Sequence, residues 1–212
     1  MPQRLRINNE GLVEGVRFIP SPNCDERPAA CAIHLLVIHY ISLPPGAFGG
    51  TGIIEHFTNR LDPSAHPFYA SIAGVKVSAH FLIRRDGGLI QFVPCAKRAW
   101  HAGKSSWKGK TRCNDFSIGI EMEGTGEVPF TAAQYRRLAT LTRVLQARYP
   151  IISSALKKRP YSKRWRKLDI TVLLPQDSSG SHFVRCVTAW TSWVSRTISI
   201  QKAERMPRVQ PK

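Results

Sequence analysis

The sequence predicts an α/β protein, and three of its segments lead to that conclusion. Residues 34–41 form an apolar run of strand length, residues 81–93 have the pattern of a β-hairpin, and a capped amphipathic helix begins after Thr131. A chain of 212 residues is long enough for one domain, or for one domain with an appendage. With 42% hydrophobic residues, it can bury a substantial core.

Residues 34–41 are expected to form a buried central strand, because the run is almost continuously apolar and ends abruptly at Leu43-Pro44. His39 lies near the C-terminal end of this strand, where α/β folds place their ligands. The alternative, a core histidine bonded to a backbone carbonyl, is the commoner role for such a residue. His34 lies five positions earlier, so it faces the other side of the sheet and cannot share a site with His39.

Two shorter elements are expected next along the chain. Residues 51–60 are compatible with a short helix that turns its apolar residues inward. Residues 81–93 are expected to form a hairpin around Asp86-Gly87. An Asp-Gly pair between apolar runs favours a type I′ turn, which needs positive φ at its centre.

The segment 117–124 alternates with period two, as a β-strand does. Its polar face carries small residues and two glutamates: Ser117, Gly119, Glu121 and Glu123. Such a face leaves room for another group to approach, and the alternative is the solvent-exposed face of an edge strand. The loop 99–103 is polar and aromatic, as the rim of a ligand site would be.

The helix after Thr131 has clear start and stop signals. Thr131 and Gln134 form a capping box, and Tyr149-Pro150 ends the helix. Its inward stripe is expected to consist of Tyr135, Leu138, Leu141, Thr142 and Leu145.

Composition limits the cellular setting. The five cysteines include no CxxC pair, which argues against a disulfide framework and against a cysteine-rich zinc site. The first residues contain no apolar signal-peptide core, and no apolar run approaches membrane-spanning length. We therefore expect a cytoplasmic, monomeric protein without a membrane partner.

The net charge of +17 is unevenly distributed. Residues 1–150 carry 18 Lys and Arg against 11 Asp and Glu, whereas residues 151–212 carry 13 against 3. A basic excess suits nucleic acid or any other anionic partner, but no nucleic-acid-binding motif accompanies it, so nucleic acid is not expected as a partner. Within the basic region, residues 168–174 could form a strand.

Four long blocks together carry a family resemblance. They are LLVIHYISLPPGAFGG (35–50), LDPSAHPFYASIAGVKVSAHFLIRRDG (61–87), KRAWHAG (97–103) and RCNDFSIGIEMEGT (112–125). Over about residues 10–150 the chain closely resembles the AmpD-type, zinc-dependent type 2 N-acetylmuramoyl-L-alanine amidases. The resemblance implies an α/β fold, a mixed β-sheet flanked by helices, as in peptidoglycan recognition proteins. It also implies a Zn2+ cofactor and hydrolysis of the muramyl–L-alanine amide of an anhydromuropeptide during cell-wall recycling.

Carried over by position, the resemblance assigns roles to individual residues. His39 matches a zinc ligand and Glu121 matches the catalytic glutamate. The motif positions that line or support the substrate groove are Trp100, His101, Arg112 and Asn114. Two departures lie inside the matched region, since Tyr40 replaces the usual Asn and Lys76 replaces the usual Arg.

The end of the chain departs from the family. The family takes two further zinc ligands, a His and an Asp, and a helper Lys from a late segment resembling GHSDIAPGRKTDPG. No such segment occurs in residues 151–212. The expected organisation is therefore an amidase domain over residues 1–150 and a basic, unpatterned tail over residues 151–212. A frameshift near codon 151 is the leading explanation, and a divergent tail is the second.

Two functions remain open at this point. The first is an amidase, and the second is a muropeptide-binding module that kept the groove but cannot hold zinc, because one histidine does not make a zinc site.

Overall fold

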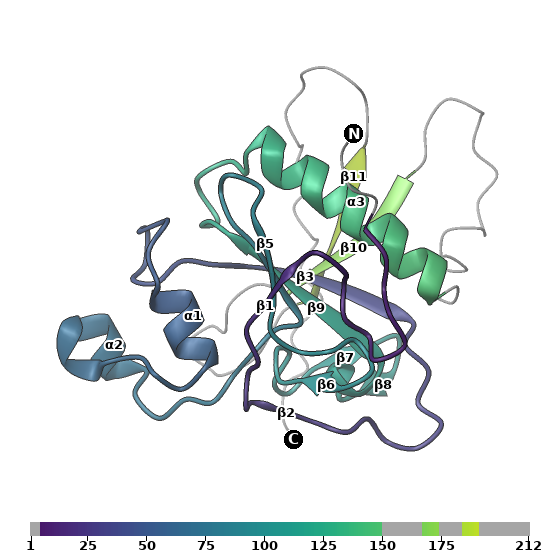
Figure 1. The fold of residues 1–212 in the computed structure, drawn as a ribbon, viewed down its shortest axis with the longest axis horizontal. Coiled ribbons are helices and arrows are strands. Elements are labelled where there is room, and N and C mark those ends of the chain that lie inside the picture. The colour runs from purple at the N-terminus through teal and green to yellow at the C-terminus, as the bar shows by residue number, and fades with distance from the viewer. Residues whose placement is uncertain (1–4, 150–166, 174–183, 191–212) are drawn as a thin grey trace, which may run out of the picture.

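The computed structural model describes residues 5–149 and two later strands, at 167–173 and 184–190 (Figure 1). The elements in chain order are β1 (Arg17–Phe18), β2 (Cys24–Asp25), β3 (Leu35–Ile41), α1 (Gly52–Phe57), a 3-10 turn (Pro63–Ala65), α2 (Pro67–Ser71), β4 (Phe81–Ile83), β5 (Leu89–Gln91), β6 (Arg98–Ala99), β7 (Ser106–Trp107), β8 (Lys110–Thr111), a second 3-10 turn (Cys113–Phe116), β9 (Ser117–Glu123), α3 (Ala132–Arg148), β10 (Lys167–Leu173) and β11 (Val184–Trp190). None of the described helices is long and apolar enough to span a bilayer.

The main sheet has seven strands in the order β1-β5-β4-β9-β3-β10-β11. Strand β9 pairs in parallel with β3 and with β4, whereas β4 and β5 pair antiparallel. The expected mixed sheet flanked by helices is therefore confirmed. Because β9 lies inside the sheet and all its residues are buried, the edge-strand alternative for residues 117–124 is wrong.

The strand expected at residues 168–174 is present as β10, with bounds Lys167–Leu173. It pairs in parallel with β3, at the positions Thr171↔Val37 and Val172↔Ile38, and β11 continues the sheet antiparallel to it. The basic run before β10 lies outside the described residues, apart from its last position.

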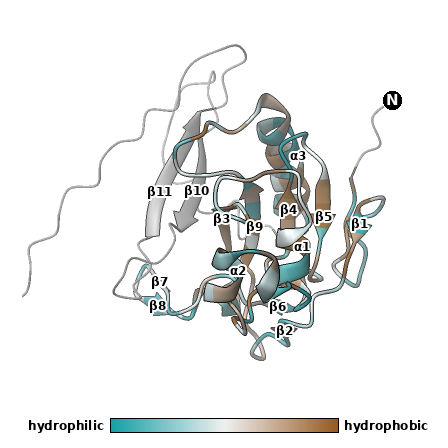
Figure 2. Cartoon of the chain, turned by 90° about the vertical axis from the view of Figure 1, so that its left-hand side faces the viewer, coloured by the Kyte–Doolittle hydropathy of each residue, from teal (hydrophilic) through white to brown (hydrophobic). Residues whose placement is uncertain are grey.

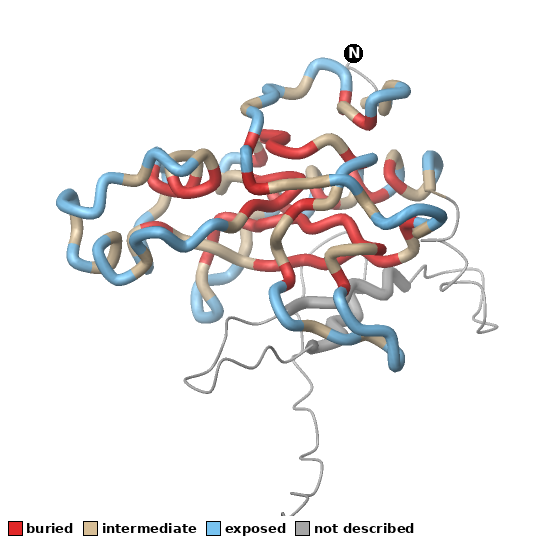
Figure 3. Tube along the Cα trace, turned by 90° about the horizontal axis from the view of Figure 1, so that it is seen from below, coloured by how far each residue is buried: buried red, intermediate tan, exposed pale blue. Residues whose placement is uncertain are grey.

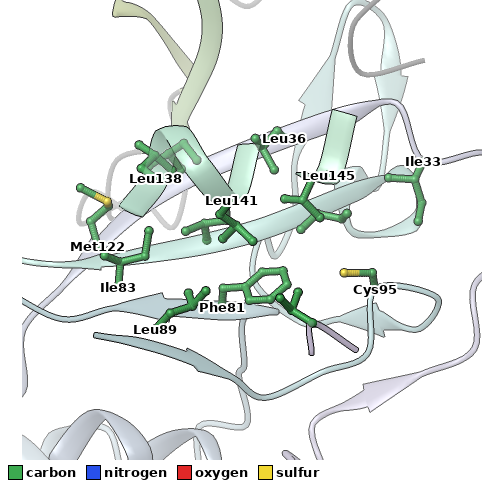
Figure 4. Packing of buried hydrophobic residues seen from close by; sticks show 14 residues of the cluster. Ile33, Leu36, Phe81, Ile83, Leu89, Cys95, Met122, Leu138, Leu141 and Leu145 are labelled. Atoms are coloured by element: carbon green, nitrogen blue, oxygen red, sulfur yellow. The ribbon is translucent and has the colours of Figure 1, made fainter. Parts of the chain in front are cut away.

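One face of the sheet packs on α3. Alternate residues of β3, β4 and β9 point to this face and meet Leu138, Leu141 and Leu145 of the helix (Figure 4). Figure 2 shows the hydrophobic residues gathered along β4 and β5, with hydrophilic residues in the outer loops. This layer is the larger part of the core, and it holds the strands in place from behind the candidate site.

The opposite face is covered by α1, α2 and the segment that follows β6. Ile53 and Phe57 of α1 pack on Leu82, and Phe116 packs near Leu35 and Val37. The central strands are buried along most of their length, because both faces of the sheet are covered (Figure 3). Residues of odd number in β3 and β9 point to this second face, so His39 and Glu121 lie there.

The capping box of α3 is confirmed. Thr131 Oγ1 accepts the backbone N–H of Gln134, and the Gln134 side chain accepts the backbone N–H of Thr131. The predicted inward stripe is correct except at Tyr135, which is 36% exposed. Gln134 is buried in its place, because its amide also donates to the carbonyls of Ile83 and Glu123.

The predicted hairpin of β4 and β5 is present, but its turn is not type I′. Gly87 has φ +84°, whereas Asp86 is not among the positive-φ residues. Gly87 N–H donates to Arg84 C=O, and Arg84 N–H donates to Gly88 C=O. This pattern belongs to a longer hairpin loop that closes on a single left-handed glycine.

We expect Leu141→Ala to lower the free energy of unfolding by about 3 kcal/mol, because it empties a fully buried site between α3 and the sheet. Chemical denaturation measures the change. Arg136→Ala on the exposed face of the same helix is the matched control, and equal effects of the two changes would contradict the packing described here.

Candidate active site

The candidate site is built on the parallel pairing of β3 with β9. His39 and Glu121 are direct partners in that pairing, so their side chains leave the same face of the sheet at the same level. Both lie near the C-terminal ends of their strands, and their exposed fractions are only 7% and 9%. The two residues predicted to carry metal binding and catalysis are therefore neighbours.

The carboxyl group of Glu121 is poorly solvated. Its Oε2 is buried and has no hydrogen-bond partner among the described residues. Burial raises the pKa of Glu121 to about 8. A carboxyl group with such a pKa can both accept and donate a proton near neutral pH, as a general acid–base catalyst must.

The side chain of His101 lies against His39. Nδ1 of His101 is 2.9 Å from Nε2 of His39, and the two rings meet edge to face at a centroid distance of 5.1 Å. Nε2 of His101 is 3.1 Å from Oγ of Ser117. A Cβ at Gly119 would lie 2.7 Å from Nδ1 of His101, which is closer than real Cβ contacts. The group that approaches the small-residue face of β9 is thus a side chain of the chain itself.

A half-buried cation, Arg27, lies close to this pair of histidines. The Arg27 guanidinium donates to four backbone carbonyl oxygens, those of Cys95, Asn114, Asp115 and Ser117. Its Nη2 also lies 3.1 Å from Nε2 of His80. Burial, with a smaller contribution from Arg27, lowers the pKa of His80 to about 3. His80 is therefore neutral, and its Nδ1 accepts the backbone N–H of Gly119.

The other predicted site residues lie in the loop that carries His101 and next to it. Asn114 Oδ1 accepts the backbone N–H groups of His101 and Ala102, so it fixes this loop. Hydrogen bonding from Arg98 and, with a smaller effect, from the Trp100 side chain lowers the pKa of the Asp25 carboxyl.

Arg112 differs from the residues of that loop. It is exposed, adopts a left-handed backbone conformation with φ 60°, and forms an ion pair of 3.1 Å with Asp115. Substrate contacts of Trp100, His101, Arg112 and Asn114 stay predictions.

Glu123 lies on the same strand face as Glu121 but serves the fold. Its two carboxylate oxygens accept the backbone N–H groups of Gly49 and Arg85, at 2.8 and 3.0 Å. Arg84 lies 3.5 Å from the same carboxylate and donates to the carbonyls of Gly49 and Gly50. Glu123 therefore anchors the loop that follows β3.

The described residues do not form a complete zinc site. They contain no group of three or more His, Cys, Asp or Glu side chains arranged to hold a metal ion. Of the ligands that the family resemblance implies, His39 alone lies in this part of the chain. Zinc in proteins needs three or four protein ligands, so the donors present here do not fit the ion.

The sequence did not predict two features of this region, the position of Arg27 and the contact between His101 and His39. Arg27 lies in the irregular N-terminal segment, and no local pattern marks it. The His101–His39 contact joins residues far apart in the sequence, and only the small residues opposite, Ser117 and Gly119, gave a signal that something approaches there.

The fold and site define an α/β protein with a buried carboxyl group of raised pKa next to a histidine, near the C-terminal ends of parallel strands. The family model for N-acetylmuramoyl-L-alanine amidase matches residues 29–171. The chain therefore belongs to the N-acetylmuramoyl-L-alanine amidase family.

Several relatives are 1,6-anhydro-N-acetylmuramyl-L-alanine amidases named AmpD. The chain is 56% identical to that of Citrobacter freundii over 146 residues, which are 69% of this chain and 78% of the relative. It is also 56% identical to that of Escherichia coli K12, over 68% of this chain and 79% of the relative. A crystal structure of a selenomethionine AmpD derivative superposes with a TM-score of 0.68 at 55% identity, covering 70% of this chain and 83% of that chain.

The raised pKa of Glu121 makes stability depend on pH. Between pH 4.5, the ordinary value, and about 8, the folded protein keeps a proton that the unfolded chain releases. The folded state therefore loses stability as pH rises through this window, by at most about 1.4 kcal/mol per pH unit. We expect Glu121→Gln, which cannot ionise, to be increasingly more stable than the unchanged protein towards pH 8.

Urea unfolding in the presence of a chelator, at several pH values, measures this difference. The exposed Glu127→Gln is the control. A stability difference for Glu121→Gln that stays constant across the window would show that the carboxyl group is ionised in the fold.

Proposed function

We propose that the protein hydrolyses the amide bond between (1,6-anhydro-)N-acetylmuramic acid and L-alanine in muropeptides, as part of cytoplasmic peptidoglycan recycling. The observation that carries the proposal is the buried Glu121 carboxyl group beside His39, on a fold shared with AmpD at more than half sequence identity. The anhydromuropeptide is the only partner required, and the protein acts as a monomer.

Glu121 supplies the proton transfers that amide hydrolysis needs. As the carboxylate, it accepts a proton from the water that attacks the amide carbon. As the carboxylic acid, it returns the proton to the alanine nitrogen while the C–N bond breaks. A pKa of about 8 keeps both forms accessible near neutral pH. Asn114 and Ser117 hold the loop and the ring of His101, which lies against His39.

Zinc enters the proposal as the metal of the family, and His39 is the proposed ligand on the described chain. Residues 5–149 contain no group of three or more side chains that could hold the ion. We propose that residues after about 150 are translated out of frame, which removes the ligand segment, with a divergent tail as the second explanation. The proposal rests on the sequence alone, because residues 151–212 carry 13 Lys and Arg against 3 Asp and Glu and lack the family's late ligand segment. The match to the family model continues to residue 171, within β10.

The reading frame can be checked directly. We expect the nucleotide sequence after codon 150, translated in the other two frames, to encode a segment similar to GHSDIAPGRKTDPG. Its recovery would identify the frameshift. Its absence from all frames would establish the divergent tail instead.

The activity test compares this chain and its frame-corrected form, each with added zinc, on an anhydromuropeptide. Release of peptide with a free L-alanine amino group is followed by chromatography. We expect Glu121→Gln to reduce turnover by at least about a hundredfold, the scale of a general base, while substrate binding persists. Glu127→Gln, on the exposed loop after β9, is the control.

Unchanged turnover in Glu121→Gln would remove this residue from the mechanism. Binding of muropeptide without hydrolysis in both forms would identify a binding module instead of an enzyme.

A further inference from the structure

One arginine bonds two carboxylates next to the loop that carries His101. Arg98 lies in β6, and its Nε and Nη2 donate to the two carboxylate oxygens of Asp25 in the paired strand β2. This is the two-pronged geometry in which a guanidinium fits a carboxylate. Nη1 of Arg98 donates to Oδ1 of Asp115 in the second 3-10 turn. We call Asp25, Arg98 and Asp115 the Arg98 clamp.

One end of the clamp holds the 3-10 turn. Asn114 directly precedes Asp115, and its Oδ1 accepts the backbone N–H groups of His101 and Ala102. Arg112 forms an ion pair with the Asp115 carboxylate. A change in the position of Asp115 would therefore move three of the predicted substrate residues together.

The other end of the clamp lies next to Trp100. The Asp25 carboxyl accepts hydrogen bonding from Arg98 and also from the Trp100 side chain. The backbone of Trp100 is fixed separately, because its N–H donates to the Ser78 hydroxyl and its carbonyl accepts the Ser78 N–H. The clamp therefore acts on the orientation of the indole rather than on the path of the chain.

The charges of the clamp are largely removed from water. The side chains of Arg98 and Asp115 are 19% and 14% exposed, whereas that of Arg112 is 68% exposed. Charge-assisted bonds in such a place are stronger than surface ion pairs, because water competes less for them. Lysine at position 98 would keep the charge but present a single ammonium group, which does not reproduce the planar fork. Arginine is thus the side chain that holds both carboxylates in fixed positions.

We propose that Arg98 is a positioning residue of the substrate groove, which holds the Trp100 indole and the 3-10 turn of Asn114 in a fixed relation to each other. Through this turn it also places the Arg112 guanidinium. Its effect on a bound muropeptide is indirect, through these neighbours. The inference rests on the proposed function for the identity of the ligand, whereas the fixed relation is a property of the protein without ligand or metal.

Nitrogen-15 NMR of the full chain tests the positions directly. The Trp100 indole N–H, identified with Trp100→Phe, reports one end of the clamp, and the Ala102 amide N–H reports the other. We expect Arg98→Lys to shift both signals. Leu141→Ala is the control, because it destabilises the fold from the α3 face of the sheet and leaves the clamp in place. Unchanged signals in Arg98→Lys would overturn the proposal.

A second variant tests the connection through Arg98 and decides the matter even if Arg98→Lys fails to fold. Asp25→Asn keeps an oxygen for Arg98 but removes the charge, at a half-buried position on β2. We expect the Ala102 amide signal to shift, although the change lies at the far end of the clamp. Glu26→Gln is the matched control, because this neighbouring acid pairs with Lys97 outside the clamp. A shift no larger than that of Glu26→Gln would show that Arg98 does not join the two ends.

Calorimetry with an anhydromuropeptide measures the consequence for the groove. We expect Arg98→Lys to weaken binding by at least about tenfold, the scale of one lost charge-assisted hydrogen bond, while Leu141→Ala binds as the unchanged protein does. Equal affinity of Arg98→Lys and the unchanged protein would overturn the role in the groove. Absence of binding in the unchanged protein would refute the proposed function and with it this role, whereas the NMR signals would still decide whether Arg98 joins the two ends.

Discussion

The arrangement of the candidate site depends on two small residues of β9, Ser117 and Gly119, which leave room for the His101 ring. The parallel pairing of β3 and β9 brings His39 level with Glu121, and Ser117 and Gly119 lie just before Glu121 on the same face. Because these two residues are small, the His101 ring can lie on the strand and reach His39. Larger residues would push the ring away and leave His39 without this partner. The small size of Ser117 and Gly119 therefore allows the contact between His101 and His39.

Two glutamates on one strand face have opposite roles because their surroundings differ. Glu123 has backbone N–H donors for both of its oxygens and an arginine nearby, so its charge is satisfied inside the fold. Glu121 has a buried oxygen that meets no hydrogen-bond partner in the described part of the chain, and burial raises the pKa of this carboxyl group. Alternation alone places both residues on the face, but it does not distinguish a carboxylate bonded within the fold from a carboxyl group with a raised pKa.

Local sequence patterns were sufficient to predict the helices and strands. They did not predict the contacts between residues that lie far apart in the sequence. The capping box at Thr131, the apolar run of β3 and the hairpin of β4 and β5 are encoded within a few residues, and all were predicted. The exposure of Tyr135 was missed because Gln134 found buried partners on two different strands. The position of His39 near Glu121 followed from family resemblance, since strand pairing is not visible in either segment by itself.

The hydrogen bonds of Arg27 limit how far the N-terminus of this domain can be truncated. The family model begins at residue 29, two positions after the arginine that donates to four backbone carbonyls, one at Cys95 and three within residues 114–117. A shortened protein that starts at the family boundary would lose this cation, and those carbonyl groups would lose its hydrogen bonds. The minimal folding unit therefore extends upstream of the region that sequence similarity defines, and any truncation should retain the segment before residue 29.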